Sequence, residues 1–293
     1  MGTRLTSDMR QNQSILAFKR ARYLKLALAL CAVAIAVYFW HEPPVVYIRP
    51  YGGTWLGYTL GTVAALLIVW LMLLGVQKRR YRSNLGSLQG WTSAHVYLGA
   101  SLLVIATLHS AFEFGWNIHT LAYALMVLVI LSGIFGVYAY LRYPELMTSN
   151  LAGENLETLL LKITDLDRKC RRLALDLPDE CNLIVMKATR EPARALGVDN
   201  SFRRQLTAIN AYCPTRAACE DLMRLSVKLD PWQARINGQL LSEMTRKSVL
   251  TDRVRHDLRF RALMRIWLYV HVPLSFALLA ALIAHIISVF YYW

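Results

Sequence analysis

Five long stretches of the sequence carry almost no charge, and they restrict the chain to one class of protein. A helix that crosses the ~30 Å hydrocarbon core of a bilayer needs about 20 residues. The five stretches cover about residues 24–40, 50–77, 91–112, 117–141 and 266–293. Soluble domains instead mix charged and apolar residues at helical or strand spacing. We therefore expect an all-α fold, a five-span transmembrane helix bundle with a helical cytoplasmic insertion between spans 4 and 5.

The basic residues lie mainly at one set of span ends. The formal net charge is +14, which could in principle serve nucleic acid, but no basic groove with interleaved aromatic residues is present. Residues 41–52 and 113–116, which connect the opposite span ends, contain Arg49 as their single basic residue. By the positive-inside rule we expect a bacterial-type cytoplasmic (inner) membrane, an outer C-terminus, membrane lipid as a partner and no nucleic acid.

Four domains follow from this topology. We expect a cytoplasmic basic N-terminus (1–22), spans 1–4 (23–142), a cytoplasmic helical domain (143–261) and span 5 (262–293). In the helical domain, one apolar stripe at heptad-like spacing predicts a first helix that Pro178 ends. A second helix is expected after Pro214. A third is expected from Asp230 towards the last span, in one continuous helix.

Five cysteines are present, and four of them lie in the helical domain at 170, 181, 213 and 219. Their odd total and irregular spacing do not indicate a disulfide framework. Metal or iron–sulfur sites usually use tighter cysteine pairs. We expect reduced and mostly buried thiols, and no glycine-rich loop indicates a nucleotide domain.

Four histidines repeat one pattern on two different spans. Trp91 is followed by His95 and then, after thirteen residues, by His109; Trp267 is followed in the same way by His271 and His285. Fourteen steps of ~100° come within about 40° of whole turns, so both histidines of a span share one face. The rise of ~1.5 Å per residue separates them by about 21 Å.

The expected topology makes the third and fifth spans parallel, because the fourth span returns between them. His95 and His271 then lie at one depth, and His109 and His285 at another. Neutral imidazole is a suitable axial ligand for haem iron. The sequence therefore predicts two stacked haem b groups (Fe), each held by two histidines. A single such histidine would more often be structural or line an ion pathway; a metal transporter would usually add carboxylates within the spans.

Further residues fit a haem site with less specificity. Gly57, Gly61, Gly133 and Gly136 allow close approach of a flat ring or of another helix. Arg265 on the inner side and Arg49 on the outer side are candidates to bind haem propionates, together with Arg261 and Lys78, although positive-inside anchoring also explains them. We expect surface positions for His41, His119 and His256.

At His95, His109, His271 and His285 the sequence resembles di-haem b-type membrane cytochromes. Two such families are the ferric-reductase-like transmembrane domain of ferric reductases and NADPH oxidases, and cytochrome b of the respiratory quinol:cytochrome c oxidoreductase. The resemblance covers about residues 50–142 and 262–293. It implies two parallel helices that carry histidine pairs on either side of a return helix. No flavin domain follows Trp293, so flavin or nicotinamide chemistry is expected to belong to a partner.

The expected function is transmembrane electron transfer through two stacked bis-His b-type haems, as the cytochrome b subunit of a redox complex. Its partners would be a redox partner protein or quinone, with an oligomer also possible. Two alternatives stay open at this point. The chain could be a quinol-oxidising or ferric-reductase-type enzyme in its own right, or a non-haem membrane-anchored interaction or sensor protein.

Overall fold

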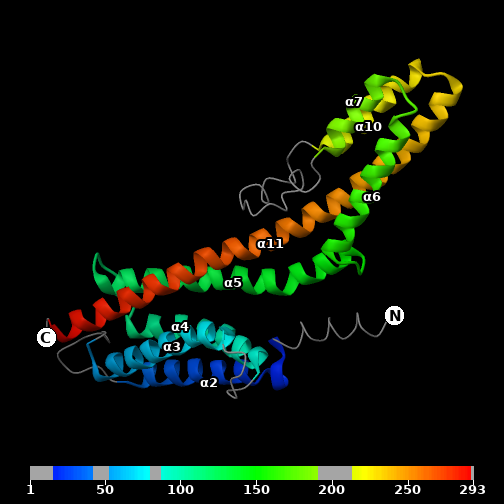
Figure 1. The fold of residues 1–293 in the computed structure, drawn as a ribbon. Helices are drawn as coiled ribbons and strands as arrows, with labels where there is room; N and C mark the ends of the chain where they lie inside the picture. The colour runs from blue at the N-terminus through cyan, green and yellow to red at the C-terminus, as the bar shows by residue number, and fades with distance from the viewer. Residues whose placement is uncertain (1–15, 42–52, 80–86, 191–212, 292–293) are drawn as a thin grey trace. The chain divides into compact units, whose positions relative to one another are not determined.

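The structure, a computed structural model, describes residues 16–41, 53–79, 87–190 and 213–291. Within these ranges the regular structure is helical and contains no strand (Figure 1). The elements, in chain order, are α2 (Phe18–Trp40), α3 (Trp55–Arg79), α4 (Leu88–His109), α5 (Ile118–Leu151), α6 (Leu156–Ala174), α7 (Asp179–Thr189), α10 (Pro214–Leu225), the 3-10 helix η1 (Ser226–Lys228) and α11 (Pro231–Tyr291).

Five of the described helices are long and apolar enough to cross a membrane, namely α2, α3, α4, α5 and α11. The predicted fold class is therefore confirmed: the chain is a five-span helix bundle, and a helical segment separates its fourth and fifth spans. Both α5 and α11 extend well beyond their apolar stretches. The prediction that one helix continues from the helical insertion into the last span is confirmed by α11, which has 61 residues.

The chain divides into two compact units. We call residues 1–141 and 267–293 the membrane unit, and residues 142–266 the insertion unit. The divisions fall inside α5 and inside α11 rather than in loops, because both helices run without interruption from one unit into the other. The domain boundaries expected at 142/143 and 261/262 therefore differ by a few residues from the divisions between the two units.

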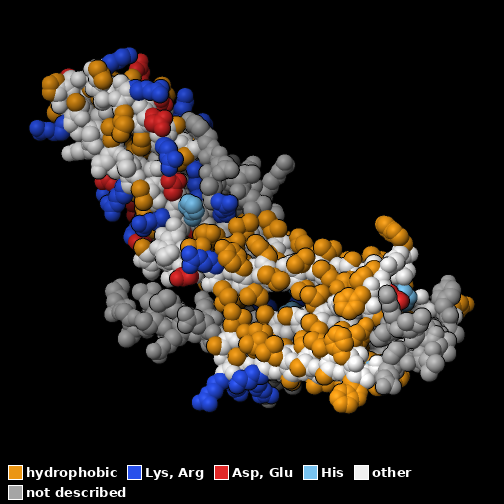
Figure 2. All heavy atoms as spheres, turned by 180° about the vertical axis from the view of Figure 1, so that it is seen from behind, with side chains coloured by type: hydrophobic (Ala, Val, Ile, Leu, Met, Phe, Trp, Pro, Cys, Tyr) orange, Lys and Arg blue, Asp and Glu red, His pale blue; other side chains and the backbone are white. Residues whose placement is uncertain are grey.

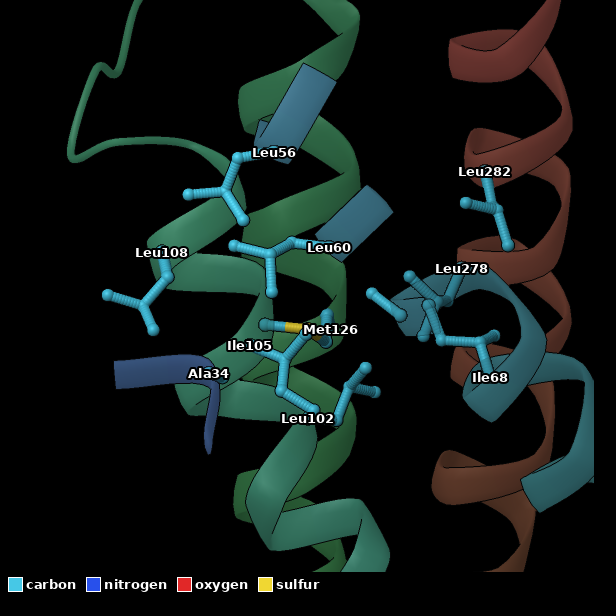
Figure 3. Packing of buried hydrophobic residues seen from close by; sticks show 11 residues of the cluster. Ala34, Leu56, Leu60, Ile68, Leu102, Ile105, Leu108, Met126, Leu278 and Leu282 are labelled. Carbon is cyan, nitrogen blue, oxygen red and sulfur yellow. The ribbon is translucent and has the colours of Figure 1, made fainter. Parts of the chain in front are cut away.

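Helix α4 is the most enclosed span of the membrane unit. In its most apolar stretch 39% of the residues are buried, against 11 to 17% in the other spans. It packs against both α2 and α3. Ser87 caps its first turn, where the hydroxyl accepts a hydrogen bond from the Gly90 amide at 3.2 Å. A buried cluster joins α4 to the remaining spans (Figure 3), with Ala34, Leu56, Leu60, Ala64, Ile68, Leu102, Ile105, Leu108, Met126, Leu278 and Leu282 as its members.

Helix α11 is fixed to α5 in the membrane unit by Trp267. The indole Nε1 donates to the carbonyl of Ser132 at 2.7 Å. Gly136 makes room for this ring, because a Cβ at that position would lie 2.1 Å from an indole carbon. The contacts of Trp267 thus fix the starting depth of the last span, four residues before His271.

The insertion unit is built on the amphipathic helix α6, whose predicted apolar stripe is confirmed. Leu159, Ile163, Leu166 and Cys170 are buried along one face. Asn155 caps the helix by accepting a hydrogen bond from the Thr158 amide at 2.7 Å. Beyond Pro178, where the sequence predicted only a stop, the structure has a further helix, α7. The core then closes with residues from α10 and α11.

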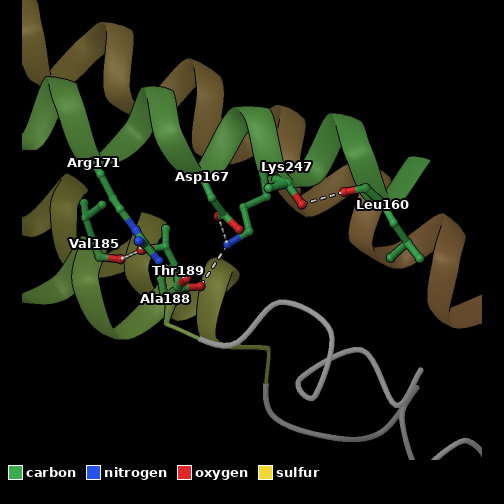
Figure 4. Close-up of polar contacts among 8 residues, drawn as sticks. Leu160, Asp167, Arg171, Val185, Ala188, Thr189 and Lys247 are labelled. Atoms are coloured by element: carbon green, nitrogen blue, oxygen red, sulfur yellow. Dashed lines mark hydrogen bonds and ion pairs between the residues drawn. The ribbon is translucent and has the colours of Figure 1, made fainter. Parts of the chain in front are cut away.

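A buried ion pair links α6 to α11 in the insertion unit (Figure 4). The Lys247 ammonium lies 2.5 Å from the Asp167 carboxylate, and the two side chains are 3% and 5% exposed. Lys247 also donates to the Ala188 carbonyl at 2.8 Å. Desolvation by burial raises the pKa of Asp167 despite the neighbouring Lys247 and Arg171. Removal from water therefore disfavours the charged carboxylate more than its cationic neighbours favour it.

The cysteines of the insertion unit are free, as are all five in the chain. Cys170 and Cys181 are buried in the core of the unit. Burial raises the pKa of Cys170 to about 11 and also raises the pKa of Cys181 and Cys219. At these three positions burial therefore favours the neutral thiol over the thiolate.

Candidate functional site

Four histidines of the membrane unit face one another in two pairs. The rings of His95 on α4 and His271 on α11 have their centres 6.5 Å apart, and those of His109 and His285 are 6.0 Å apart. The same step of fourteen residues separates the two histidines on each helix. The structure thus brings the four residues together in the predicted pairs, because α4 and α11 run parallel and in register in this unit.

The ring separations match two imidazoles that share one metal ion. A metal–imidazole bond is about 2 Å long, and the centre of the ring lies about 1.1 Å beyond the nitrogen. Two rings on opposite sides of one ion therefore have centres roughly 6.3 Å apart. Both observed separations lie close to this value. A direct hydrogen bond brings two imidazole rings closer together, as for His119 and His285, whose centres are 4.4 Å apart.

The Nδ1 atoms of the two α4 histidines are bound to main-chain carbonyls of α3. His95 Nδ1 lies 3.0 Å from the Leu71 oxygen, and His109 Nδ1 lies 2.7 Å from the Gly57 oxygen. A carbonyl can only accept a hydrogen bond, so Nδ1 must carry the proton in both rings. The neutral ring then presents an unprotonated Nε2 with a lone pair, which is the form that binds metal.

Ser132 fixes His271 in the same tautomer. The serine hydroxyl donates to the Val129 carbonyl at 2.8 Å, so its oxygen accepts the proton of His271 Nδ1 at 2.6 Å. His285 Nδ1 is hydrogen-bonded to Nδ1 of His119 on α5. All four paired histidines therefore use Nδ1 for a second-layer contact. Among the described residues none has a hydrogen-bond partner at Nε2.

Glycine at position 61 is required by the ring of His109. A Cβ at Gly61 would lie 2.7 Å from His109 Cε1, closer than real Cβ contacts come. Gly133 faces His271 at an ordinary 3.7 Å. Part of the glycine pattern in the spans is therefore explained by contacts with the paired histidines and with Trp267, and not by helix packing alone.

An apolar layer lies between the two histidine pairs. It is formed by Leu102 and Ile105 of α4, Met126 of α5, and Leu278 and Leu282 of α11, all buried (Figure 3). The sequence segments that join the paired histidines contain no charged residue. Hydrophobic side chains also cover the outside of the membrane unit, and this surface is hollowed at one point (Figure 2). The side chains between the two histidine pairs are therefore apolar and carry no charge.

The structure does not test the roles proposed for the candidate propionate partners. Arg265 is exposed and belongs to the insertion unit, and Arg49 lies outside the described residues. Arg261 donates to the Asp257 carboxylate at 2.7 Å, and Lys78 is exposed at the end of α3. The roles of Arg265 and Arg49 therefore stay predictions.

The contact of His119 was missed by the sequence analysis. Its exposed position was expected, but its ring also lies edge-on against His285, with the ring planes at 88°. One signal in the sequence could have indicated this contact. His119 lies in the first turn of the fourth span, which begins near the depth of His109.

His41 also differs from expectation. It is half-buried, and its ring lies edge-on against the ring of Trp55, with the two centres 5.1 Å apart. His256 is exposed as expected.

Protein donors alone do not form a metal site in the parts of the chain that the structure describes, where no three His, Cys, Asp or Glu side chains are grouped for that purpose. Haem iron takes four ligands from the porphyrin and needs only two from the protein.

No protein-family model matches the chain, and neither the curated proteins nor the solved structures include a significant match. The function of the chain is therefore inferred from the geometry of the histidines.

Proposed function

We propose that the chain is a di-haem b-type cytochrome that transfers electrons across a bacterial-type cytoplasmic membrane. The observation that supports this best is the geometry of the two histidine pairs. Their ring centres lie 6.5 and 6.0 Å apart, and each ring has Nδ1 engaged and Nε2 without a hydrogen-bond partner among the described residues. A structural role would not need the matched separations or the use of Nδ1 in all four rings.

Each histidine has a defined task in this proposal. His95 and His271 would hold one haem, and His109 and His285 would hold the other, about 21 Å away along the helices. When bound, haem would supply an iron centre that gains and loses one electron, and two histidine ligands would favour electron transfer over oxygen binding. Leu71, Gly57 and Ser132 keep the ligand rings in the binding tautomer.

The direction of the bundle follows from the basic residues. Arg79 at the end of α3 and the arginines that precede Trp267 would lie on the cytoplasmic side. The His95–His271 pair is then the inner site and the His109–His285 pair the outer site. Arg265 and Arg49 would bind propionates at these two levels. A redox partner protein or a quinone would deliver or remove electrons, with lipid around the bundle.

Electron transfer across a vesicle membrane tests the proposal. The purified protein is inserted into phospholipid vesicles that contain trapped ferricyanide, and the reductant dithionite is added outside. We expect the trapped ferricyanide to be reduced by wild-type vesicles and not by vesicles that carry His109→Leu or contain no protein. Wild-type protein that binds two haems but leaves the ferricyanide oxidised would contradict the transmembrane function.

Gly61→Val should weaken haem binding at the His109–His285 site. Any Cβ at this position meets the ring of His109, so valine displaces the ring from its place opposite His285. We expect a 10–100-fold loss in affinity for one of the two haems, as for other changes around metal ligands. Gly75→Val is the matched control on the same helix, because a Cβ at Gly75 meets nothing within 4 Å. Haem titration of the two variants checks the difference; equal affinities would contradict the expected role of Gly61.

A further inference from the structure

His285 differs from the other three paired histidines in what its Nδ1 contacts. His95 and His109 donate to main-chain carbonyls, and His271 donates to the Ser132 hydroxyl. The partner of His285 is the imidazole of His119. The outer pair therefore has a third imidazole in its second layer, and the inner pair has none among the described residues.

Helix α5 holds His119 in place through its first turn. Asn117 Oδ1 accepts a hydrogen bond from the Thr120 amide at 2.9 Å, and Thr120 Oγ1 accepts one from the Gly115 amide at 3.0 Å. These contacts fix the backbone on both sides of His119. Its ring meets the ring of His285 at nearly a right angle, with centres 4.4 Å apart. The hydrogen bond thus comes from a defined turn of the helix.

We infer that His119 is a positioning residue that sets the orientation and the donor strength of His285. This inference rests on the proposed function. With Nε2 of His285 directed at iron, Nδ1–H of His285 donates to the lone pair on Nδ1 of His119. An imidazole nitrogen is a stronger base than a carbonyl oxygen, so His285 gives more electron density to the iron. This stabilises the oxidised iron relative to the reduced iron at the outer site, and it makes the two sites unequal.

Redox titration of haem-loaded variants tests the inference. We expect His119→Ala to retain both haems and to favour reduction of one of them by about tenfold, which is a shift of about 59 mV for a one-electron centre. His119→Asn should restore part of the wild-type potential, because Oδ1 can accept the same hydrogen bond but is a weaker acceptor than the imidazole nitrogen. Ser132→Ala should move the potential of the other haem, and His41→Ala should move neither. The electron paramagnetic resonance signal of the oxidised outer haem should change in His119→Ala as the ring of His285 turns.

Each outcome of these titrations either supports or overturns the proposed role of His119. Unchanged potentials and spectra in His119→Ala would overturn it. Loss of the same haem in His119→Ala, His119→Asn and His285→Ala would overturn it as well, because His119 would then itself be a ligand. Loss in His119→Ala with retention in His119→Asn would support it. Wild-type protein without haem would refute the proposed function and this inference together, whereas a two-haem wild type with an inert His119 would refute the inference alone.

Discussion

Replacing His95 by alanine removes one of the two haems from the purified protein, and replacing His109 by alanine removes the other. The reason is geometric, since each substitution leaves one imidazole without the ring that lies 6.5 or 6.0 Å from it. A methyl group cannot bind iron and leaves a gap between the helices. The pyridine haemochrome assay measures the haem content, and we expect it to fall by half in each variant.

Double variants identify the pairs. His95→Ala with His271→Ala should still contain one haem, because both substitutions act on the same site. His95→Ala with His285→Ala should contain none. The control is His256→Ala, since His256 is exposed in the insertion unit and should leave the haem content at the wild-type value. Equal haem content in the two double variants would show that the rings are not paired as the structure has them.

Lys247→Met destabilises the insertion unit by about 3–5 kcal/mol, the usual effect of removing one partner of a buried ion pair. Asp167 would be left buried without its cation, and the Ala188 carbonyl would lose its donor. For a domain of this size the midpoint of thermal unfolding should fall by roughly 10–25 °C. Circular dichroism of the protein in detergent measures the change.

Two further variants separate the ion pair from other effects of this substitution. Lys187→Met removes an exposed lysine from α7 and should leave the unfolding midpoint within a degree or two of wild type. Asp167→Leu with Lys247→Met removes both charges and should be more stable than Lys247→Met alone. A Lys247→Met protein as stable as wild type would show that the buried pair contributes nothing to the unit.

The membrane spans could be predicted from the sequence because they form through local interactions. A bilayer accepts a helix of sufficient length and low charge almost regardless of its neighbours, so the apolar runs predicted the existence and order of α2, α3, α4, α5 and α11. They did not predict how far α5 and α11 extend beyond the apolar stretches. The heptad-like stripe on α6 was readable for the same reason. Helix α7 was not predicted, because the sequence analysis uses Pro178 only to end the preceding helix. Proline also commonly begins a helix.

The approach of the paired histidines was also predictable, since equal spacing and parallel helices place the rings at matching depths. Their second-layer partners were not. Leu71 and Gly57 contribute main-chain oxygens, which carry no signal in a sequence. His119 is brought to His285 by the antiparallel approach of α5 and α11, a tertiary contact between residues 166 positions apart. Lys247 looked like any helix-surface lysine, and only the fold buries it.

The ratio of haem to protein in the purified wild-type chain tests the central claim most directly. The protein should be expressed in a membrane host, purified in mild detergent and assayed for haem b and for protein by amino-acid analysis. The two histidine pairs predict a ratio of two, with a sharp alpha band in the reduced-minus-oxidised spectrum. A folded, stable and colourless protein would contradict the claim, and the four imidazoles would then have to serve the bundle without haem.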